Sequence, residues 1–299
     1  MKKGIFLSLL TLSFLFVFSQ SDNTQVPPPL TAPWEVVEVN EFPGPIPYPT
    51  VKQNDIDWQR TIWREIDLRE KRNQSLYFPI EPHGIYKSLG QLIIDAIDMN
   101  NPDNENALPI YTNENCNIKV PRSEIKNALT NTRKMVQYDP NTGEPVGEVD
   151  LVESFTAAQI MYYRLKEVWF FDKNRGELNV RILEIEPFFE YEKDAGMGTD
   201  ENDMKPLTAK RRLGYIKYDE LRPFLSQQLY YSTKNPALKL TFDDILTWKR
   251  YFSSYIIADG AQHNNREIQD YIKNPRDQRL ESDRILNEIR NYESELWEY

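Results

Sequence analysis

The side chains that most often carry catalysis or bind metals are scarce in this chain. It has two histidines, His83 and His263, and one cysteine, Cys116. Neither histidine belongs to a His-x-x-x-His or His-x-Glu arrangement, which would place two metal ligands on one helical face. No Gly-x-Ser-x-Gly turn supports a catalytic triad, although one histidine with a distant serine stays an open alternative. The sequence predicts no catalytic residue, no metal site and no cofactor.

The 46 acidic residues offer a second route to chemistry. Two suitably spaced carboxylates suffice for a glycosidase, but composition cannot select a pair, and a solvated acidic surface accounts for most of them. The acids between residues 193 and 205 lack the alternating spacing and central glycine of an EF-hand, so this run is interpreted as a polar loop; they are Asp194, Asp200, Glu201 and Asp203. The 11 glycines form no Gly-x-Gly-x-x-Gly phosphate loop.

The first 19 residues have the pattern of a signal peptide. Lys2 and Lys3 precede an apolar run over 5–18, and Val17 and Ser19 occupy the small-residue positions of a cleavage site before Gln20. A retained membrane anchor is the alternative, but the run is short for a span. Cleavage removes two lysines and no acid, which changes the net charge from −10 to −12. We expect an exported protein that inserts into no membrane and binds no nucleic acid.

A single cysteine permits no internal disulfide, so a buried core must stabilise the fold. Cys116 lies between two asparagines, and nothing nearby in the sequence would lower its pKa. We expect it to be a small buried or semi-buried residue, and a reactive thiol is the alternative.

Residues 20–50 are predicted to form an extended, proline-rich arm. Three prolines stand in a row at 27–29 and four alternate with other residues over 43–49, a spacing that favours polyproline II and forbids a helix. Trp34, Ile46 and Tyr48 lie in this arm, which cannot bury them itself. The arm is either a spacer or a strap that lays these side chains on a neighbouring surface.

A globular core is predicted over residues 51–275. A first helix is expected from Asn54, with an apolar stripe of Trp58, Ile62, Trp63 and Ile66 and with Glu65–Arg69 and Asp67–Lys71 pairs on its outer face. Further helices are expected at 89–97, from Pro121, at 219–228 and after a Thr241–Asp244 capping box. Strands are expected at 160–171 and 178–185, joined by a hairpin turn at 172–176, and near 215–218. The predicted fold class is α+β, with mixed helices around a small antiparallel sheet.

The last element is a long amphipathic helix over 276–299. Its apolar residues Ile285, Ile289, Tyr292 and Leu296 form a narrow seam that suits packing on another helix or subunit. The seam could equally pack on the rest of its own chain. Because six tryptophans and 17 tyrosines in an acidic chain suit protein recognition, we select Trp34, Ile46, Tyr48, Ile289, Tyr292 and Leu296 as candidate interface residues.

Several segments, in order along the chain, resemble a family of known proteins. They are Asp55…Trp58…Ile62-Trp63-Arg64-Glu65-Ile66-Asp67-Leu68-Arg69-Glu70-Lys71…Asn73, Lys166-Glu167-Val168-Trp169-Phe170-Phe171-Asp172-Lys173, Val180-Arg181-Ile182, Phe242-Asp243-Asp244, Arg250-Tyr251-Phe252-Ser253-Ser254, Arg266-Glu267-Ile268-Gln269-Asp270-Tyr271 and the tail Glu293–Tyr299. Together they resemble the GldN/PorN gliding-motility and type IX secretion proteins of Bacteroidetes. The run Arg211-Arg212-Leu213-Gly214-Tyr215-Ile216 departs from the apolar strand expected there.

The resemblance implies a non-enzymatic structural protein of the periplasm. In this family the protein assembles with an outer-membrane lipoprotein of the GldK/PorK type into a large ring beneath the outer membrane, and the ring is thought to connect with the inner-membrane motor proteins GldL and GldM. The alternative is a periplasmic glycan-binding protein or hydrolase that uses carboxylates. Activity or glycan binding in the absence of any protein partner would favour that alternative.

Overall fold

The computed structural model describes residues 44–98, 101, 104, 106–138, 145–193, 207–232, 239–261 and 265–297. The expected signal peptide, Trp34, His263 and nearly all of the polar loop at 193–205 lie outside these residues. The described part belongs to one unit that runs from Phe42 to Tyr299. The predicted boundaries at residues 19, 50 and 275 remain predictions.

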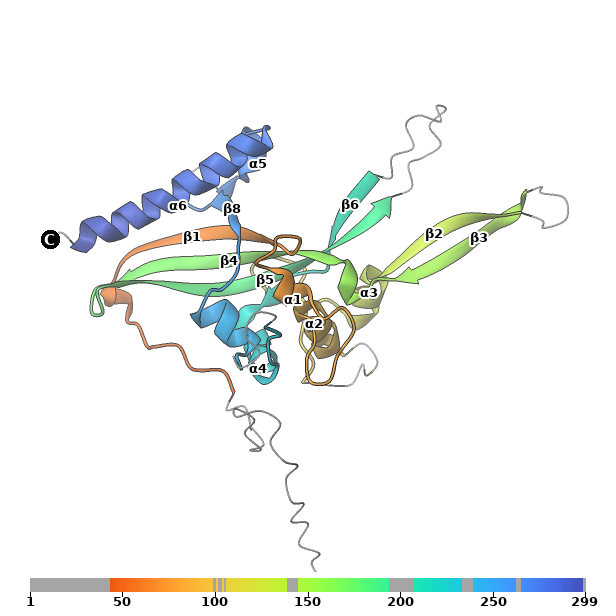
Figure 1. Ribbon diagram of the computed structural model, residues 1–299, viewed down its shortest axis with the longest axis horizontal. Coiled ribbons are helices and arrows are strands. Elements are labelled where there is room, and N and C mark those ends of the chain that lie inside the picture. The colour runs from red at the N-terminus through yellow and green to blue at the C-terminus, as the bar shows by residue number, and fades with distance from the viewer. Residues whose placement is uncertain are drawn as a thin grey trace, which may run out of the picture. The chain divides into compact units, whose positions relative to one another are not determined.

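An antiparallel sheet, with helices packed on it, organises this unit (Figure 1). Its strands run in the order β6-β5-β4-β1-β8, and β7 pairs with β5. They are β1 (Ile56–Asp67), β4 (Ile160–Asp172), β5 (Glu177–Lys193), β6 (Leu207–Arg212), β7 (Ile216–Lys217) and β8 (Tyr255–Asp259). A separate two-stranded sheet pairs β2 (Thr130–Tyr138) with β3 (Pro145–Ser154). The predicted α+β class is confirmed.

The helical elements are short except for the last. They are α1 (Gln74–Tyr77), α2 (Leu89–Ile97), α3 (Arg122–Ala128), α4 (Tyr218–Gln227), α5 (Ile268–Tyr271) and α6 (Pro275–Trp297), with 3-10 turns at Gln53–Asp55 and Ala157–Gln159 and a π-helical turn at Asp244–Trp248. The predicted helix at 89–97 is confirmed, and Ser88 caps it by accepting a hydrogen bond from the backbone N–H of Gln91. The Thr241–Asp244 capping box is also confirmed, but it opens only the five-residue π-helical turn.

The predicted helix at the start of the core is wrong, because residues 56–67 form strand β1. Trp58, Ile62 and Ile66 recur every four residues, a spacing compatible with one face of a helix and also with one face of a strand. Arg60 and Glu65 are buried among the apolar residues, so burial does not alternate simply with residue type. The expected helical ion pairs are replaced by a pair between Arg69 and Asp67 and by contacts of Glu65 with distant strands.

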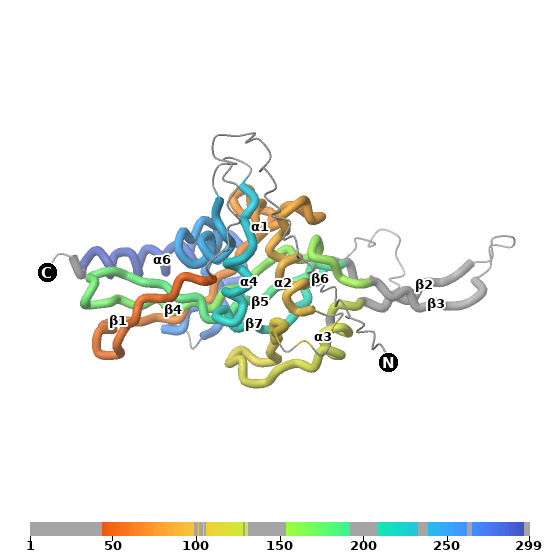
Figure 2. The backbone as a smooth tube through the Cα atoms, turned by 90° about the horizontal axis from the view of Figure 1, so that it is seen from below, coloured from red at the N-terminus to blue at the C-terminus, as the bar shows by residue number. Residues whose placement is uncertain are grey.

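Two apolar clusters hold the sheet and helices together. The larger one packs α2 and α4 against the sheet through residues such as Ile66, Leu165 and Phe189. The second lies under α6 and contains Ile62, Trp169, Ile256, Ile268, Ile285 and Ile289. As a result, α6 runs beside the end of the sheet where β4 turns into β5 (Figure 2).

Candidate functional site

One face of the central sheet carries a row of alternating charges. Residues directly opposite each other on antiparallel strands share a face. The register places Glu65 of β1 opposite Arg164 of β4, and Arg164 opposite Glu186 of β5. We call this side of the sheet the polar face.

A second row of the polar face ties a loop to the sheet. The Lys166 Nζ lies 3.3 Å from Glu184 on the next strand and 3.1 Å from Glu114 in the loop between α2 and α3. The indole N–H of Trp63 donates to the same Glu114 carboxylate at 2.8 Å. The polar face therefore positions a segment that is remote in the sequence.

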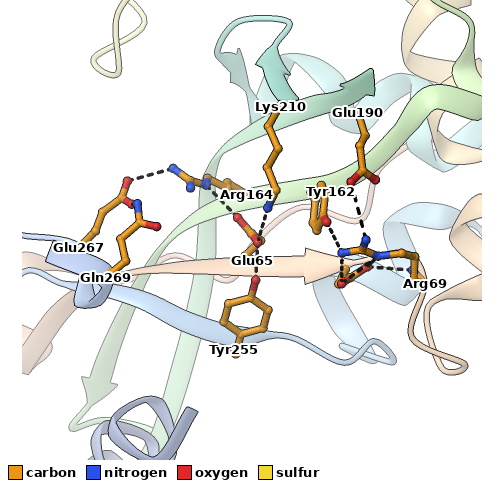
Figure 3. A network of polar contacts seen from close by, with 10 residues as sticks. Glu65, Arg69, Tyr162, Arg164, Glu190, Lys210, Tyr255, Glu267 and Gln269 are labelled. Carbon is orange, nitrogen blue, oxygen red and sulfur yellow. Dashed lines mark hydrogen bonds and ion pairs between the residues drawn. The ribbon is translucent and has the colours of Figure 1, made fainter. Parts of the chain in front are cut away.

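Glu65 is the centre of the network (Figure 3). It is only 4 % exposed, and its carboxylate accepts hydrogen bonds from Arg164 Nε at 3.0 Å, from Lys210 Nζ at 3.4 Å and from the Tyr255 hydroxyl. These donors come from β4, β6 and β8, so one carboxylate of β1 links four strands. Burial, followed by the nearby Glu65 carboxylate, raises the pKa of Tyr255, which keeps its hydroxyl protonated as a donor.

The polar face ends in a pocket of about 330 Å³ against the start of α5 and α6. Arg164 links two of its lining residues: its Nη1 donates a hydrogen bond to Glu267 at 2.9 Å, and its Nε donates one to Glu65. The pocket is lined by Glu65, Arg164, Lys210, Tyr255, Ile256, Ile257, Glu267, Ile268, Gln269, Pro275, Gln278 and Arg279. Such a volume is at the lower end of the range for small-ligand pockets.

The carboxylates of the polar face do not form the open pair that a glycosidase needs. Glu65, Glu184 and Glu186 are buried, and each contacts a cationic side chain. Burial raises the pKa of Glu186 to about 7, against the opposing effect of the guanidinium groups of Arg212 and Arg164. The arrangement is suited to holding segments of the chain together.

Residues 44–50, which we call the strap, lie on the chain's own core. The Arg222 guanidinium lies 4.2 Å from the centre of the Tyr48 ring, and that of Arg181 lies 5.2 Å from it. Arg222 Nη2 donates to the carbonyl of Ile46 at 2.6 Å and Arg181 Nη2 to that of Pro49 at 2.7 Å. Tyr48 is thus bound within its own chain, whereas the Ile46 side chain is 53 % exposed.

The candidate interface residues on α6 have mixed positions. Ile289 is 1 % exposed and belongs to the second apolar cluster. The Tyr292 ring packs on Trp58 with 5.1 Å between ring centres. The side chain of Leu296, like all of Trp34, lies outside what the structure describes. An interface role for the six selected residues remains a prediction.

Of the residues tested for chemistry, Cys116 lies two positions from Glu114 of the polar face, and its Sγ is 4.0 Å from the Glu114 carbonyl oxygen. His83 is exposed in a turn and bridges to Tyr86 through the backbone. Burial raises the pKa of the Cys116 thiol to about 11, so it is protonated at neutral pH. Within the described ranges, no group of three or more His, Cys, Asp or Glu side chains could hold a metal ion.

The polar network was not predicted, although the sequence contains one signal for it. Arg164 and Lys166 stand at alternate positions of one predicted strand. Glu184 lies near the end of the next predicted strand, and Glu186 follows just past that end. A hairpin at 172–176 brings the two pairs opposite each other, so the charges could have been assigned to one face. Lys210, Tyr255 and Glu267 gave no comparable signal, because only tertiary contacts bring the first two to Glu65 and the third to Arg164.

A comparison with known families covers most of the chain. The model of the family described as "Gliding motility associated protein GldN" matches residues 51–298, which include every strand of the central sheet and α6. A search of curated proteins finds no match. None of the helices in the described part of the chain has the length and apolar composition of a membrane span. The chain therefore belongs to the GldN family of gliding-motility and type IX secretion proteins.

Proposed function

We propose that this protein is a periplasmic structural subunit that assembles, together with an outer-membrane lipoprotein of the GldK/PorK type, into the ring of the type IX secretion and gliding machinery. The observation that carries the proposal is the GldN family match over residues 51–298. The family is a structural component of that machinery. The ring, the lipoprotein partner and contacts with GldL- and GldM-type motor proteins are the parts that this proposal adds.

The expected signal peptide supports a periplasmic location at the inner face of the outer membrane. The apolar run over 5–18 is preceded by two lysines and followed by a cleavage pattern. No cysteine comes directly after the run, so attachment to the outer membrane would depend on a lipoprotein partner.

The proposed role is non-catalytic. The carboxylates that gather on the polar face are buried in ion pairs, and the Cys116 thiol is protonated at neutral pH. Contacts with partners are proposed for the exposed Ile46 and for Trp34 upstream of the strap. A head-to-tail ring needs two different complementary surfaces on each subunit, and an arm that reaches a neighbour could supply one of them.

Electron microscopy of the mature protein, alone and mixed with the outer-membrane lipoprotein encoded in the same genome, tests the proposal. Rings or arcs in the mixture are expected. Dispersed monomers in both samples would contradict the proposal. Binding to peptidoglycan or turnover of it by the purified protein alone would favour the glycan-binding or hydrolase alternative instead.

A further inference from the structure

In the pocket at the end of the polar face, the carboxylates already accept hydrogen bonds, whereas two cationic side chains are still partly exposed. Glu65 is buried beneath three donors, and Glu267 accepts from Arg164 and from Gln269. Both carboxylates are thus already engaged by donors of their own chain. A ligand that enters the pocket meets the remaining side chains of its walls.

Two cations stand on different walls of the pocket. Lys210 is on β6 and Arg279 is in the first part of α6, and their side chains are 43 % and 53 % exposed. Their ionic contacts are long, at 3.4 Å from Lys210 Nζ to Glu65 and 3.6 Å from Arg279 Nη1 to Glu70. Charge-assisted hydrogen bonds are typically about 2.7–2.9 Å long, so both groups can donate more strongly than they do here.

The charge of the lining also favours an anion. The lining carries three cations, Arg164, Lys210 and Arg279, against two carboxylates, Glu65 and Glu267. Glu70, which lies outside the lining, pairs with Arg279 at 3.6 Å. Ile257 and Pro275 supply accessible apolar wall next to the cations. A carboxylate on a short aliphatic stem matches this combination, with its oxygens toward Lys210 and Arg279 and its methylene groups on Ile257 and Pro275.

We propose that this pocket binds the carboxylate of an acidic side chain that an assembly partner inserts between Lys210 and Arg279. The choice of a partner protein as the source of the carboxylate rests on the proposed function. Binding of the carboxylate itself does not, because it follows from the pocket. The two parts are tested separately.

The first experiment tests the pocket with N-acetyl-L-glutamate as the probe and N-acetyl-L-glutamine as its uncharged analogue. A ligand that binds only the folded protein raises Tm. The glutamate probe should raise the Tm of the full mature chain above the effect of the glutamine probe. The rise should be lost in K210Q/R279Q and kept in R276Q/R290Q, which removes two exposed charges of α6 outside the pocket. Equal shifts in all three proteins would overturn the proposal.

The second experiment tests the source of the carboxylate through assembly with the lipoprotein. K210Q/R279Q should weaken co-assembly by roughly tenfold or more in a sedimentation titration, since loss of a charge-assisted contact typically costs at least that much. K210R/R279K keeps both charges and should assemble nearly as the wild type does, and R276Q/R290Q should assemble normally.

Two outcomes separate this inference from the proposed function. If K210Q/R279Q forms rings as readily as the wild type, the partner side chain is not the ligand, whatever the first experiment gives. If the wild type forms no rings at all, the ring proposal and the assignment of the carboxylate to a partner both fail, while the Tm measurement still decides whether the pocket binds a carboxylate.

Discussion

The guanidinium group of Arg222 lies against the ring of Tyr48, 4.2 Å from its centre, and fastens the strap to α4. Arg222 is itself held by Asp243, with Nε–Oδ1 and Nη2–Oδ2 distances of 3.0 and 2.9 Å. This bidentate pair fixes the plane of the guanidinium, so that the same group can stack on Tyr48 and donate to the carbonyl of Ile46. The end of the proline-rich arm is therefore packed on the globular core.

Tyr48→Ala should release the strap. Loss of a half-buried aromatic ring and its cation–π contacts is expected to lower the free energy of unfolding by about 2 kcal/mol. Urea denaturation measures this loss, and Ile46→Ala is the control because its side chain is exposed. Equal stabilities of the two variants would show that the Tyr48 contacts contribute little.

Removal of the chain upstream of the strap should affect stability less than removal of the strap as well. Removal of residues 20–43 leaves the carbonyls of Ile46 and Pro49 on Arg222 and Arg181 and should preserve stability. Removal of residues 20–50 exposes these arginines and should lower Tm. Comparison of both proteins in lipoprotein assembly then isolates the contribution of residues 20–43, Trp34 included, to partner contacts. A lower Tm on removal of residues 20–43 alone would contradict the prediction that only the strap contributes to stability.

Glu167→Gln should be severely destabilising. The Glu167 carboxylate is buried and takes hydrogen bonds from Arg250 Nη2 at 2.7 Å and Trp169 Nε1 at 2.9 Å, with Arg64 Nη1 at 3.7 Å. Without its charge, two largely buried guanidinium groups face each other uncompensated, which typically costs about 3–5 kcal/mol. Chemical denaturation measures the loss. Asp283→Asn, at an exposed position of α6, should stay within about 0.5 kcal/mol of the wild type.

Ile289→Ala tests the attachment of α6 to the sheet. Truncation of this buried side chain should cost about 2–4 kcal/mol, because it leaves a cavity next to Ile62 and Trp169. Leu280→Ala removes an apolar side chain of the same helix that is 59 % exposed, and it should have little effect on Tm. If Leu280→Ala impaired lipoprotein assembly at unchanged Tm, the outer side of α6 would be a contact surface.

Glu186 should make stability depend on pH in an unusual direction. Its pKa is about 7 in the folded protein and 4.5 as a free group, so the folded state binds the proton more tightly than the unfolded state between these values. The stability that this proton contributes is complete at low pH and is lost as the pH rises toward and past 7. The wild type should lose on the order of 3 kcal/mol relative to Glu186→Gln between pH 4 and pH 8.

Urea denaturation of the wild type and Glu186→Gln across that range measures the difference. Asp283→Asn is the control for the removal of a carboxylate elsewhere. A difference between wild type and Glu186→Gln that stays constant with pH, or that changes with the opposite sign, would show that Arg212 and Arg164 outweigh burial at this site.

Where the sequence has a strong local pattern, the predicted helix or strand was correct. The apolar positions of 89–97 follow one helical face, and the aromatic run of 160–171 faces a period-two strand across a short turn. The long helix at the C-terminal end was also predicted correctly. Each of these segments carries its own start and stop signals, which act over a few residues.

Strand β1 shows where local reasoning fails. Its tryptophans and isoleucines at three- and four-residue spacing also fit a helix, and buried charges interrupt the alternation that would mark a strand. The ladder to β4, at residues about a hundred positions away, decides the conformation. A propensity that differs little between two states is overridden when one state gains a full set of interstrand hydrogen bonds.

By itself, the sequence determined the α+β class, the long terminal helix, the β4–β5 hairpin and the resemblance to the GldN family, because each is encoded in contiguous residues. Only the tertiary structure decided that Glu65 would be a buried hub, since its partners Arg164 and Tyr255 lie 99 and 190 positions away. It also decided that Tyr48 and Ile289 would pack on their own chain. The physical reason is that burial and charge pairing depend on which surfaces meet, and the order of residues along one segment does not specify its neighbour.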